Sequence, residues 1–302
     1  MDARKRALVE RYGAWTAHDV QLAEGVWTRD HAPGDAPRLR RVLQLASDLA
    51  AKPVEQLRVL DLGCLEGQYA IEFALHGAEV VGIEGREANL AKARLAKEVL
   101  GLERLELIQD DVRRLDPEVH GSFDVVLCLG LLYHLDATDV FGFLARLRSV
   151  CHGLAVVDTH VCLAGRRTYE HDGQSYRGLT FVEHSRRASG SEREASRWAS
   201  LDNSESFWPT RASLLNGLQH AGFTSVLQCE VPVVPGVPRD RVTMVATAGE
   251  PVELRAVPSA NAVGAAAVPE APRIPPFIQN QSRVFNLLKR AVLDVRARRS
   301  SR

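Results

Sequence analysis

Between residues 57 and 160, short apolar runs alternate with longer segments whose apolar residues recur at helical spacing. The apolar runs cover 57–63, 79–85, 105–111, 122–130 and 154–160. The segments with helical spacing cover 68–77, 86–101 and 139–151. Because strands that alternate with helices form a parallel sheet covered on both faces, this rhythm predicts a doubly wound, Rossmann-like α/β fold.

The sequence after residue 209 completes the predicted sheet. Residues 210–223 have helical spacing, and 224–234 and 240–249 are apolar runs joined by a short turn with proline and glycine. A link this short indicates an antiparallel pair. We therefore predict a seven-stranded, mostly parallel sheet with an antiparallel terminal strand.

The remaining segments suggest additions to this α/β domain. We predict a mostly helical N-terminal cap with a hairpin-like middle, and a polar insertion that is either a lid or a solvated decoration. A proline-rich linker, which we expect to be disordered, precedes a basic amphipathic tail that either docks on a membrane surface or partner or is loosely attached. The predicted boundaries are 1–52 for the cap, 53–249 for the α/β domain, 161–209 for the insertion, 250–276 for the linker and 277–302 for the tail.

Charge and cysteine content narrow the class of protein. The chain has 38 Lys and Arg against 38 Asp and Glu, so it carries no overall charge that would attract nucleic acid or membrane. Its five cysteines include no C-x-x-C pair, which argues against a zinc or redox motif. The sequence shows neither a signal-peptide pattern nor an apolar run of about 18 residues. We expect a soluble, cytoplasmic protein without a transmembrane segment.

The turn after the first predicted strand is the strongest indication of a ligand site. In VLDLGCLEG (59–67), Asp61 lies at the end of the strand, and Gly63 and Gly67 lie in the turn to the helix. Glycine lets the backbone turn sharply and approach a ligand. In an open α/β sheet this turn lies where ligands bind, although a glycine-rich turn alone is a weak signal.

Acidic residues at the next two strand ends strengthen this signal. Glu84 ends the second strand, where a carboxylate can accept hydrogen bonds from both ribose hydroxyls. Asp110 and Asp111 end the third strand, where a carboxylate can accept from an adenine amino group and the Val112 N–H can donate to a ring nitrogen. This series predicts a site for an adenine nucleoside. A dinucleotide-dependent dehydrogenase is disfavoured, because Leu65 occupies the second glycine position of its G-x-G-x-x-G turn.

Four segments resemble the class I S-adenosylmethionine-dependent methyltransferase family: VLDLGCLEG, VVGIEGRE, IQDDVRRL and FDVVLCLGLLYHL, the last with a YHL motif after the fourth strand. The resemblance implies S-adenosylmethionine as the cofactor. It places Asp61 at the methionine amino group, Glu84 at the ribose and Asp111 at the adenine. The full implied cofactor site comprises Asp61, Gly63, Cys64, Gly67, Glu84, Gly85, Asp110, Asp111, Val112, Leu129 and Gly130. Many members have a third glycine where this chain has Leu65.

Candidate groups for the methyl acceptor follow the fourth and fifth strands. Methyl transfer depends on alignment of the acceptor, and a base is needed only where the acceptor loses a proton. Tyr133 and His134 follow the fourth strand, His160 ends the fifth, and Glu170 lies in the insertion. We choose His134 first as a general base or orienting group, although a structural role fits it equally well. Glu170 would suit carbon methylation with late proton removal.

Two further patterns are less specific. The set His160, Glu170, His171, Glu183 and His184 contains metal-ligating residue types, but no helical i, i+4 pair supports a metal site, and we predict none. The segment AWTAHDVQLAEGVW (14–27) resembles an N-terminal element of some methyltransferases with the YHL feature, including enzymes that modify the wobble uridine of transfer RNA. The likeness implies that Trp15, His18 and Trp27 help to close the pocket; packing in the core is the alternative for the tryptophans.

Three functions remain open from the sequence. The leading one is methyl transfer by in-line displacement to a small molecule: a specialised metabolite, sugar, lipid precursor or isoprenoid. The second is modification of transfer RNA, for which the arginines at 4, 6, 11, 38, 40 and 41 would form a basic surface. The third is a non-catalytic binding protein, which the series of acids disfavours.

Overall fold

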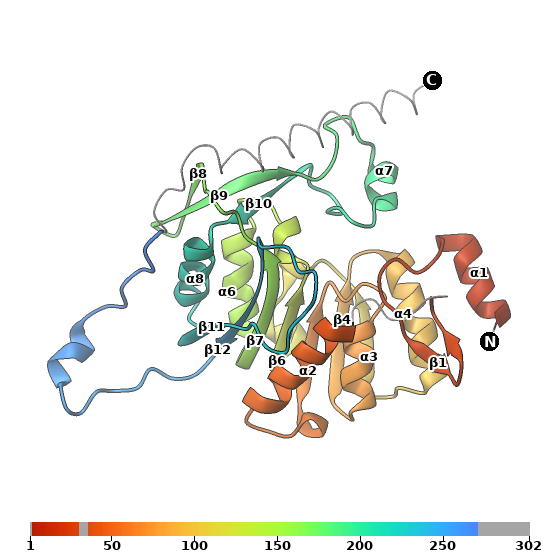
Figure 1. Cartoon of the computed structure of the whole chain (residues 1–302), viewed down its shortest axis with the longest axis horizontal. Helices are drawn as coiled ribbons and strands as arrows, with labels where there is room; N and C mark the ends of the chain where they lie inside the picture. Colours follow the sequence, from red (N-terminus) through yellow and green to blue (C-terminus); the bar gives the residue numbers. More distant parts are fainter. Residues whose placement is uncertain (1, 30–35, 271–302) are drawn as a thin grey trace.

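The computed structural model describes residues 2–29 and 36–270. Its main feature is a seven-stranded sheet in the order β11-β12-β7-β6-β3-β4-β5 (Figure 1). The strands are β3 (Arg58–Leu62), β4 (Glu79–Glu84), β5 (Leu105–Gln109), β6 (Phe123–Leu129), β7 (Cys151–His160), β11 (Ser225–Gln228) and β12 (Arg241–Thr247). β12 pairs antiparallel with both β7 and β11, whereas the other neighbours pair parallel. The predicted doubly wound, mostly parallel sheet is confirmed.

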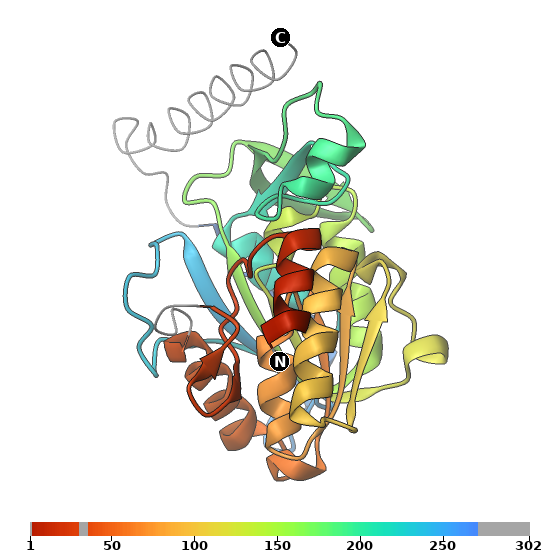
Figure 2. The ribbon, with the colours of Figure 1, turned by 90° about the vertical axis from the view of Figure 1, so that its right-hand side faces the viewer.

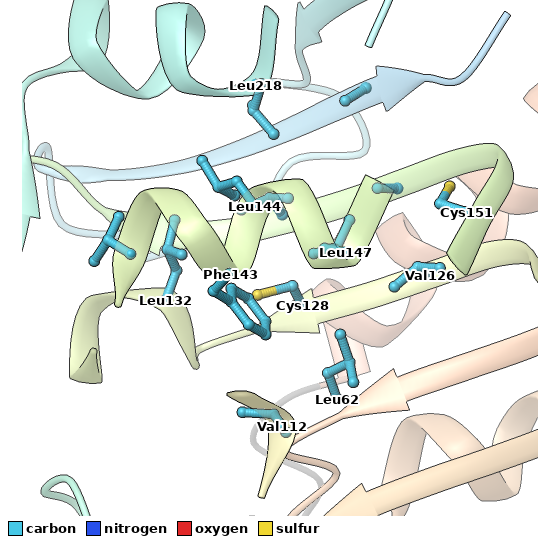
Figure 3. Packing of buried hydrophobic residues seen from close by; sticks show 14 of the residues in the cluster. Leu62, Val112, Val126, Cys128, Leu132, Phe143, Leu144, Leu147, Cys151 and Leu218 are labelled. Carbon is cyan, nitrogen blue, oxygen red and sulfur yellow. The ribbon is translucent and has the colours of Figure 1, made fainter. Parts of the chain in front are cut away.

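Helices cover both faces of the sheet because its apolar side chains alternate between them. Val59 packs in one core with α2, α3 and α4, whereas Leu60 and Leu62 pack in a second core with α6 and α8. Figure 3 shows Phe143 and Leu147 of α6 in this second core, close to Cys128 of β6. The helices are α2 (Ala36–Leu49), α3 (Gln68–Leu75), α4 (Glu87–Leu100), α5 (Pro117–His120), α6 (Val140–Val150) and α8 (Arg211–His220).

The N-terminal region consists of α1 (Asp2–Tyr12), a small hairpin of β1 (Gln21–Ala23) and β2 (Val26–Trp27), and α2. Helix α1 lies beside α4, where Arg4 hydrogen bonds to Glu98 (Figure 2). The residues between α1 and the hairpin run past the turn after β3, where residues 16–18 donate to Glu66, and past the middle of α4, where Lys92 donates to the Ala14 carbonyl.

The insertion at 161–209 is not structureless. It contains a three-stranded antiparallel sheet in the order β10-β9-β8, formed by β8 (Arg167–His171), β9 (Gln174–Val182) and β10 (Glu205–Pro209), and the short helix α7 (Gly190–Ala195). β10 contacts the 3-10 turn η3 (Leu132–His134), which follows β6. Figure 1 shows the insertion above the sheet, at the end where β6 stops. We call this insertion the lid.

The described part of the predicted linker, residues 250–270, is an exposed chain with one 3-10 turn, η4 (Pro258–Ala262). Its end differs from the predicted disorder. Glu270 accepts hydrogen bonds from Thr210 Oγ1 and Ser213 Oγ at 2.6 and 3.1 Å, at the beginning of α8. A carboxylate is stabilised at the beginning of a helix by the unpaired N–H groups there. The predicted tail, 277–302, lies outside the described residues. Within the described ranges, no helix is long and apolar enough to cross a membrane.

Candidate active site

A cavity of about 520 Å³ lies at the carboxyl ends of β3, β4, β5 and β6, between the N-terminal region and the lid. Every residue of the predicted cofactor site lines it except Gly67. The topology explains this convergence, because the carboxyl ends of parallel neighbouring strands meet at one edge of the sheet.

The turn after β3 has left-handed backbone at three positions: Gly63 at φ 65°, Leu65 at φ 52° and Gly67 at φ 83°. Leu65, which departs from the family pattern, thus adopts a conformation that glycine takes without strain. Its N–H donates to Glu84 Oε2 at 2.9 Å, so the turn is tied to the end of β4. A Cβ at position 67 would lie 3.0 Å from Ala93 Cβ. Gly67 therefore allows α3 to begin close to α4, and its predicted direct contact with the cofactor is not supported.

Two buried carboxylates form the centre of the cavity wall. Asp61 is 2% exposed and accepts from the Ala70 N–H at 3.2 Å. Burial, with a smaller contribution from the negative charge of Glu84, raises the pKa of Asp61 to about 7. Burial also raises the pKa of Glu84, although the N–H groups of Arg86 and Leu65 partly oppose it. Buried acids of this kind favour a ligand with positive charge or several donors. The amino group and the ribose of S-adenosylmethionine have these properties.

Asn89 is a site residue that the sequence reasoning missed. It lines the cavity and has no exposed surface. Its amide helps to lower the pKa of Glu84, yet neither amide atom makes a well-aligned hydrogen bond within the described part of the chain. A buried amide without good partners is costly unless a ligand supplies them. One feature of the sequence could have indicated Asn89 as a site residue. It lies in the first turns of α4, five residues after Glu84.

The end of β5 combines acids with an unpredicted arginine. Asp110 and Asp111 both line the cavity. Burial raises the pKa of Asp111, but hydrogen bonds and the charge of Arg113 outweigh it and hold this pKa below its ordinary value. Arg113 also pairs with Asp202 of the lid. This arginine therefore joins the strand end expected at the adenine to the lid.

Tyr133 and His134 line the cavity next to Gly130, at the turn η3. His134 Nδ1 lies 3.1 Å from Glu183 Oε1, a carboxylate of the lid that is only 2% exposed. The backbone carbonyl of Tyr133 accepts from Trp208 Nε1 at 3.0 Å. The sequence reasoning placed Glu183 only among potential metal ligands, and its pairing with His134 was not foreseen.

Two predicted catalytic candidates do not line the cavity. His160 lies behind Tyr133, with its ring centroid 4.8 Å from that ring and 4.7 Å from Trp208, and it pairs with Asp240. Glu170 is exposed on β8, the strand of the lid sheet farthest from β10 and η3. We correct both assignments: the geometry gives His160 a packing role and gives Glu170 no contact with the cavity.

The histidines and glutamates considered as metal ligands do not converge. Glu183 faces His134, whereas His184 Nε2 lies 2.7 Å from the Ser200 carbonyl and His171 lies beside Asp172. In the residues that the structure describes, no group of three or more His, Cys, Asp or Glu side chains could hold a metal ion.

The N-terminal segment closes one side of the cavity. Ala17 and His18 line it, and the backbone N–H groups of residues 16–18 donate to Glu66, a fully buried carboxylate in the turn after β3. Lys92 of α4 pairs with Glu66 at 3.1 Å and lies over the ring of Trp15. Of the three residues predicted to close the pocket, His18 lines it and Trp15 is buried behind it. Trp27 is 36% exposed on the hairpin and does not line the cavity.

The lid closes the other side and is fixed by Arg86. The Arg86 guanidinium lies within hydrogen-bond distance, 3.0 to 3.3 Å, of five backbone carbonyl oxygens of the lid, which share the hydrogens of its Nε and Nη2. These carbonyls belong to Arg193, Glu194, Ser196, Ala199 and Ser200. The N–H of Arg86 itself donates to Glu84 Oε1. Arg86 thus connects the strand end expected at the ribose with the lid.

Comparison with known proteins agrees with this geometry. A family model described as a methyltransferase domain matches residues 59–152. The N-terminal domain of EvdMO1, crystallised in the presence of S-adenosylhomocysteine and D-fucose, has a similar fold with a TM-score of 0.62 and 27% sequence identity. The match covers 82% of this chain and 98% of that domain. Residues 59–152 therefore match a methyltransferase domain, and the fold is that of class I S-adenosylmethionine-dependent methyltransferases. The N-terminal domain of EvdMO1 was also crystallised with S-adenosylhomocysteine bound.

Curated relatives match this chain over shorter stretches. The ubiquinone biosynthesis O-methyltransferase of Acinetobacter baumannii (strain AYE) is 37% identical over 98 residues, which are 32% of this chain and 39% of the relative. The protein of the same name from Azotobacter vinelandii is 44% identical over 78 residues, 26% of this chain and 33% of the relative. The chain therefore spans well under half of the length of these relatives.

Proposed function

We propose that this methyltransferase transfers a methyl group from S-adenosylmethionine to a hydroxyl group of a small, sugar-like molecule. The observation that carries the proposal is the cavity itself, in which the buried acids of β3 and β4 share one space with Tyr133 and His134 under the lid. A volume of about 520 Å³ is typical of sites for small ligands.

The residues of the cavity divide into two groups in this proposal. Asp61 would accept from the methionine amino group, Glu84 and Asn89 would contact the ribose, and Asp110 or Asp111 would lie at the adenine. When bound, S-adenosylmethionine supplies an electrophilic methyl group. Tyr133 and His134 would face the acceptor, and the lid would exclude water from it.

The solved relative favours a sugar-like acceptor. The match to the N-terminal domain of EvdMO1 covers 82% of this chain, and that crystal was obtained in the presence of D-fucose. The ubiquinone relatives align over no more than about a third of this chain, so they carry less information on the acceptor.

The arginines considered for binding transfer RNA favour a small molecule instead. Arg41 is buried and donates to the backbone carbonyls of Glu230 and Pro232. Arg38 lines the cavity near Asp158, and Arg4 pairs with Glu98. An RNA-binding surface needs exposed cations to neutralise phosphates. Arg41 and Arg38 face the protein interior, whereas Arg4 remains 60% exposed.

Substitution of His134 tests the proposal. With methyl-labelled S-adenosylmethionine and D-fucose as the first acceptor probe, we expect His134→Ala to lower kcat about 100-fold, the scale for loss of a general base. Affinity for S-adenosylhomocysteine, measured by calorimetry, should stay nearly unchanged. His171→Ala, in the distant strand β8, is the matched control. Equal kcat for the wild type and His134→Ala would remove His134 from the reaction, and no transfer to any hydroxylated sugar would refute the proposed acceptor class.

A further inference from the structure

We propose that Glu183 of the lid is a positioning residue for His134, so that the base required by a hydroxyl acceptor is complete only when the lid is in place. This inference rests on the proposed methyl transfer and deepens it. It assigns a function to a buried carboxylate that the sequence reasoning did not connect with catalysis.

Three donors surround the Glu183 carboxylate. Ser206 Oγ donates to Oε1 at 2.7 Å, and the Ser200 N–H donates to Oε2 at 3.1 Å. His134 Nδ1 lies 3.1 Å from Oε1. When Glu183 is ionised, its carboxylate only accepts hydrogen bonds, and His134 then carries its hydrogen on Nδ1.

The tautomer has a direct chemical consequence. With its hydrogen on Nδ1, the His134 ring keeps a lone pair on Nε2, and the residue lines the cavity beside Tyr133. A carboxylate in this position also stabilises the positive charge that the ring acquires when it takes up a proton. Glu183 therefore both orients the ring and favours its action as a base.

The two members of the pair come from different parts of the molecule. His134 lies in η3, directly after the core strand β6, whereas Glu183 follows β9 of the lid. The lid loop that donates to Glu183 through Ser200 is the loop whose carbonyls accept from Arg86. The same contacts thus hold the loop to the cofactor side and place Glu183 against His134.

The proposed step combines proton transfer to His134 with methyl transfer to the acceptor oxygen. The acceptor hydroxyl gives its proton to His134 Nε2, and its oxygen forms a bond to the methyl carbon. The carbon–sulfur bond breaks with its electron pair remaining on sulfur, which yields neutral S-adenosylhomocysteine and a methyl ether. A base of this kind is needed for an alcohol, which is only weakly acidic. An acceptor that is already an anion at neutral pH does not need it.

The test compares Glu183→Gln with Glu170→Gln, the same change at an exposed lid position outside the cavity. We expect Glu183→Gln to lower kcat by about 10- to 100-fold, part of the range for general base catalysis. KM for the acceptor and the calorimetric affinity for S-adenosylhomocysteine should change less than about twofold, because the proton transfer is affected and the binding contacts remain. Glu170→Gln should behave as the wild type.

Two further measurements separate positioning from a general loss of structure. The defect of Glu183→Gln should shrink as the acceptor hydroxyl is made more acidic, for example by fluorine on the neighbouring carbon, because less help from the base is then needed. In the protein without cofactor, nitrogen chemical shifts of His134 should report hydrogen on Nδ1 in the wild type and a shifted tautomer distribution in Glu183→Gln.

The outcomes are distinguishable. A wild-type protein that transfers no methyl group to any hydroxyl acceptor would refute the proposed function. If the wild type transfers the methyl group and Glu183→Gln does so at the same rate, the proposed function stands but the positioning role of Glu183 is overturned. A defect that is the same for all acceptors and accompanied by weakened S-adenosylhomocysteine binding would show that Glu183 only stabilises the lid.

Discussion

At the scale of single residues, the cavity wall at the ends of β3 and β4 contains two carboxylates that the protein keeps away from water, Asp61 and Glu84. Glu84 accepts two backbone N–H bonds, from Leu65 and Arg86, so its oxygens are held in place before a ligand arrives. A preorganised acceptor of this kind loses little entropy on binding. Its charge should therefore matter more for affinity than for the local fold.

Glu84→Gln is expected to weaken binding of S-adenosylhomocysteine by about 1–3 kcal/mol, the scale for hydrogen bonds to a charged group. Calorimetry measures this directly. Glu87→Gln is the matched control, since Glu87 pairs with Arg94 on the partly exposed surface of α4. Unchanged affinity in Glu84→Gln would mean that this carboxylate does not contact the ribose.

The raised pKa of Asp61 predicts that binding of S-adenosylhomocysteine releases a proton. Its pKa of about 7 lies above the ordinary value, so at pH 6 the free protein holds most of this proton. A ligand amino group with positive charge favours the ionised carboxylate and expels the proton. Calorimetry in buffers of different ionisation enthalpy should detect release of nearly one proton at pH 6 and almost none at pH 8, and affinity should rise with pH up to about 7. Asp61→Asn should abolish the release; release that persists in this variant would exclude Asp61 as its source.

Leu65 predicts a measurable backbone strain. Left-handed backbone costs a residue with a Cβ about 1–2 kcal/mol, whereas glycine adopts it freely but gains entropy in the unfolded chain. Leu65→Gly should therefore have a free energy of unfolding about 1 kcal/mol higher than Leu65→Ala. Comparing two truncations cancels the loss of leucine contacts, and denaturant unfolding measures both. Equal stabilities, or a more stable alanine variant, would contradict the strain.

At the scale of elements, the lid is fixed by one buried side chain. Arg86 reaches five lid carbonyls between residues 193 and 200. Helix α7 has only six residues and exposed side chains, so it has little packing of its own. The order of the loop should depend on Arg86.

Arg86→Lys is expected to speed amide hydrogen exchange in residues 193–203 by about tenfold or more, since two or more hydrogen bonds of about 1 kcal/mol each are lost. Exchange in β3 should stay the same. Arg94→Lys on the same helix provides the control. Unchanged exchange in the loop would show that other contacts hold the lid.

The pattern of apolar residues in each element explains which parts of the fold could be predicted from the sequence. The strand ends of the main sheet were predictable because strands such as 125–129 are continuously apolar and their carboxyl ends must converge. The lid sheet was not, because β8 is mostly exposed and has no apolar alternation in its burial. Glu183 was missed as a partner of His134 because 49 residues separate them and only the pairing of β9 with β10 against η3 brings them together.

At the scale of the whole molecule, two separate segments enclose one cavity. The N-terminal segment is held by Glu66 and the lid by Arg86, and Arg197 of the lid donates to the Ala14 carbonyl and to Thr16 Oγ1. The N-terminal segment and the lid therefore touch each other beside the cavity. A cavity of about 520 Å³ between these two segments suits a small acceptor.

The most direct test is to incubate the full chain with methyl-labelled S-adenosylmethionine and a fractionated extract of its host, with His134→Ala in parallel. We expect label in the small-molecule fraction, and strongly reduced label with the variant. The labelled product should resist mild acid and mild base, as a methyl ether does. Label in the RNA fraction would contradict the proposed small acceptor. It would indicate instead that the arginines of the N-terminal region form a docking surface for RNA.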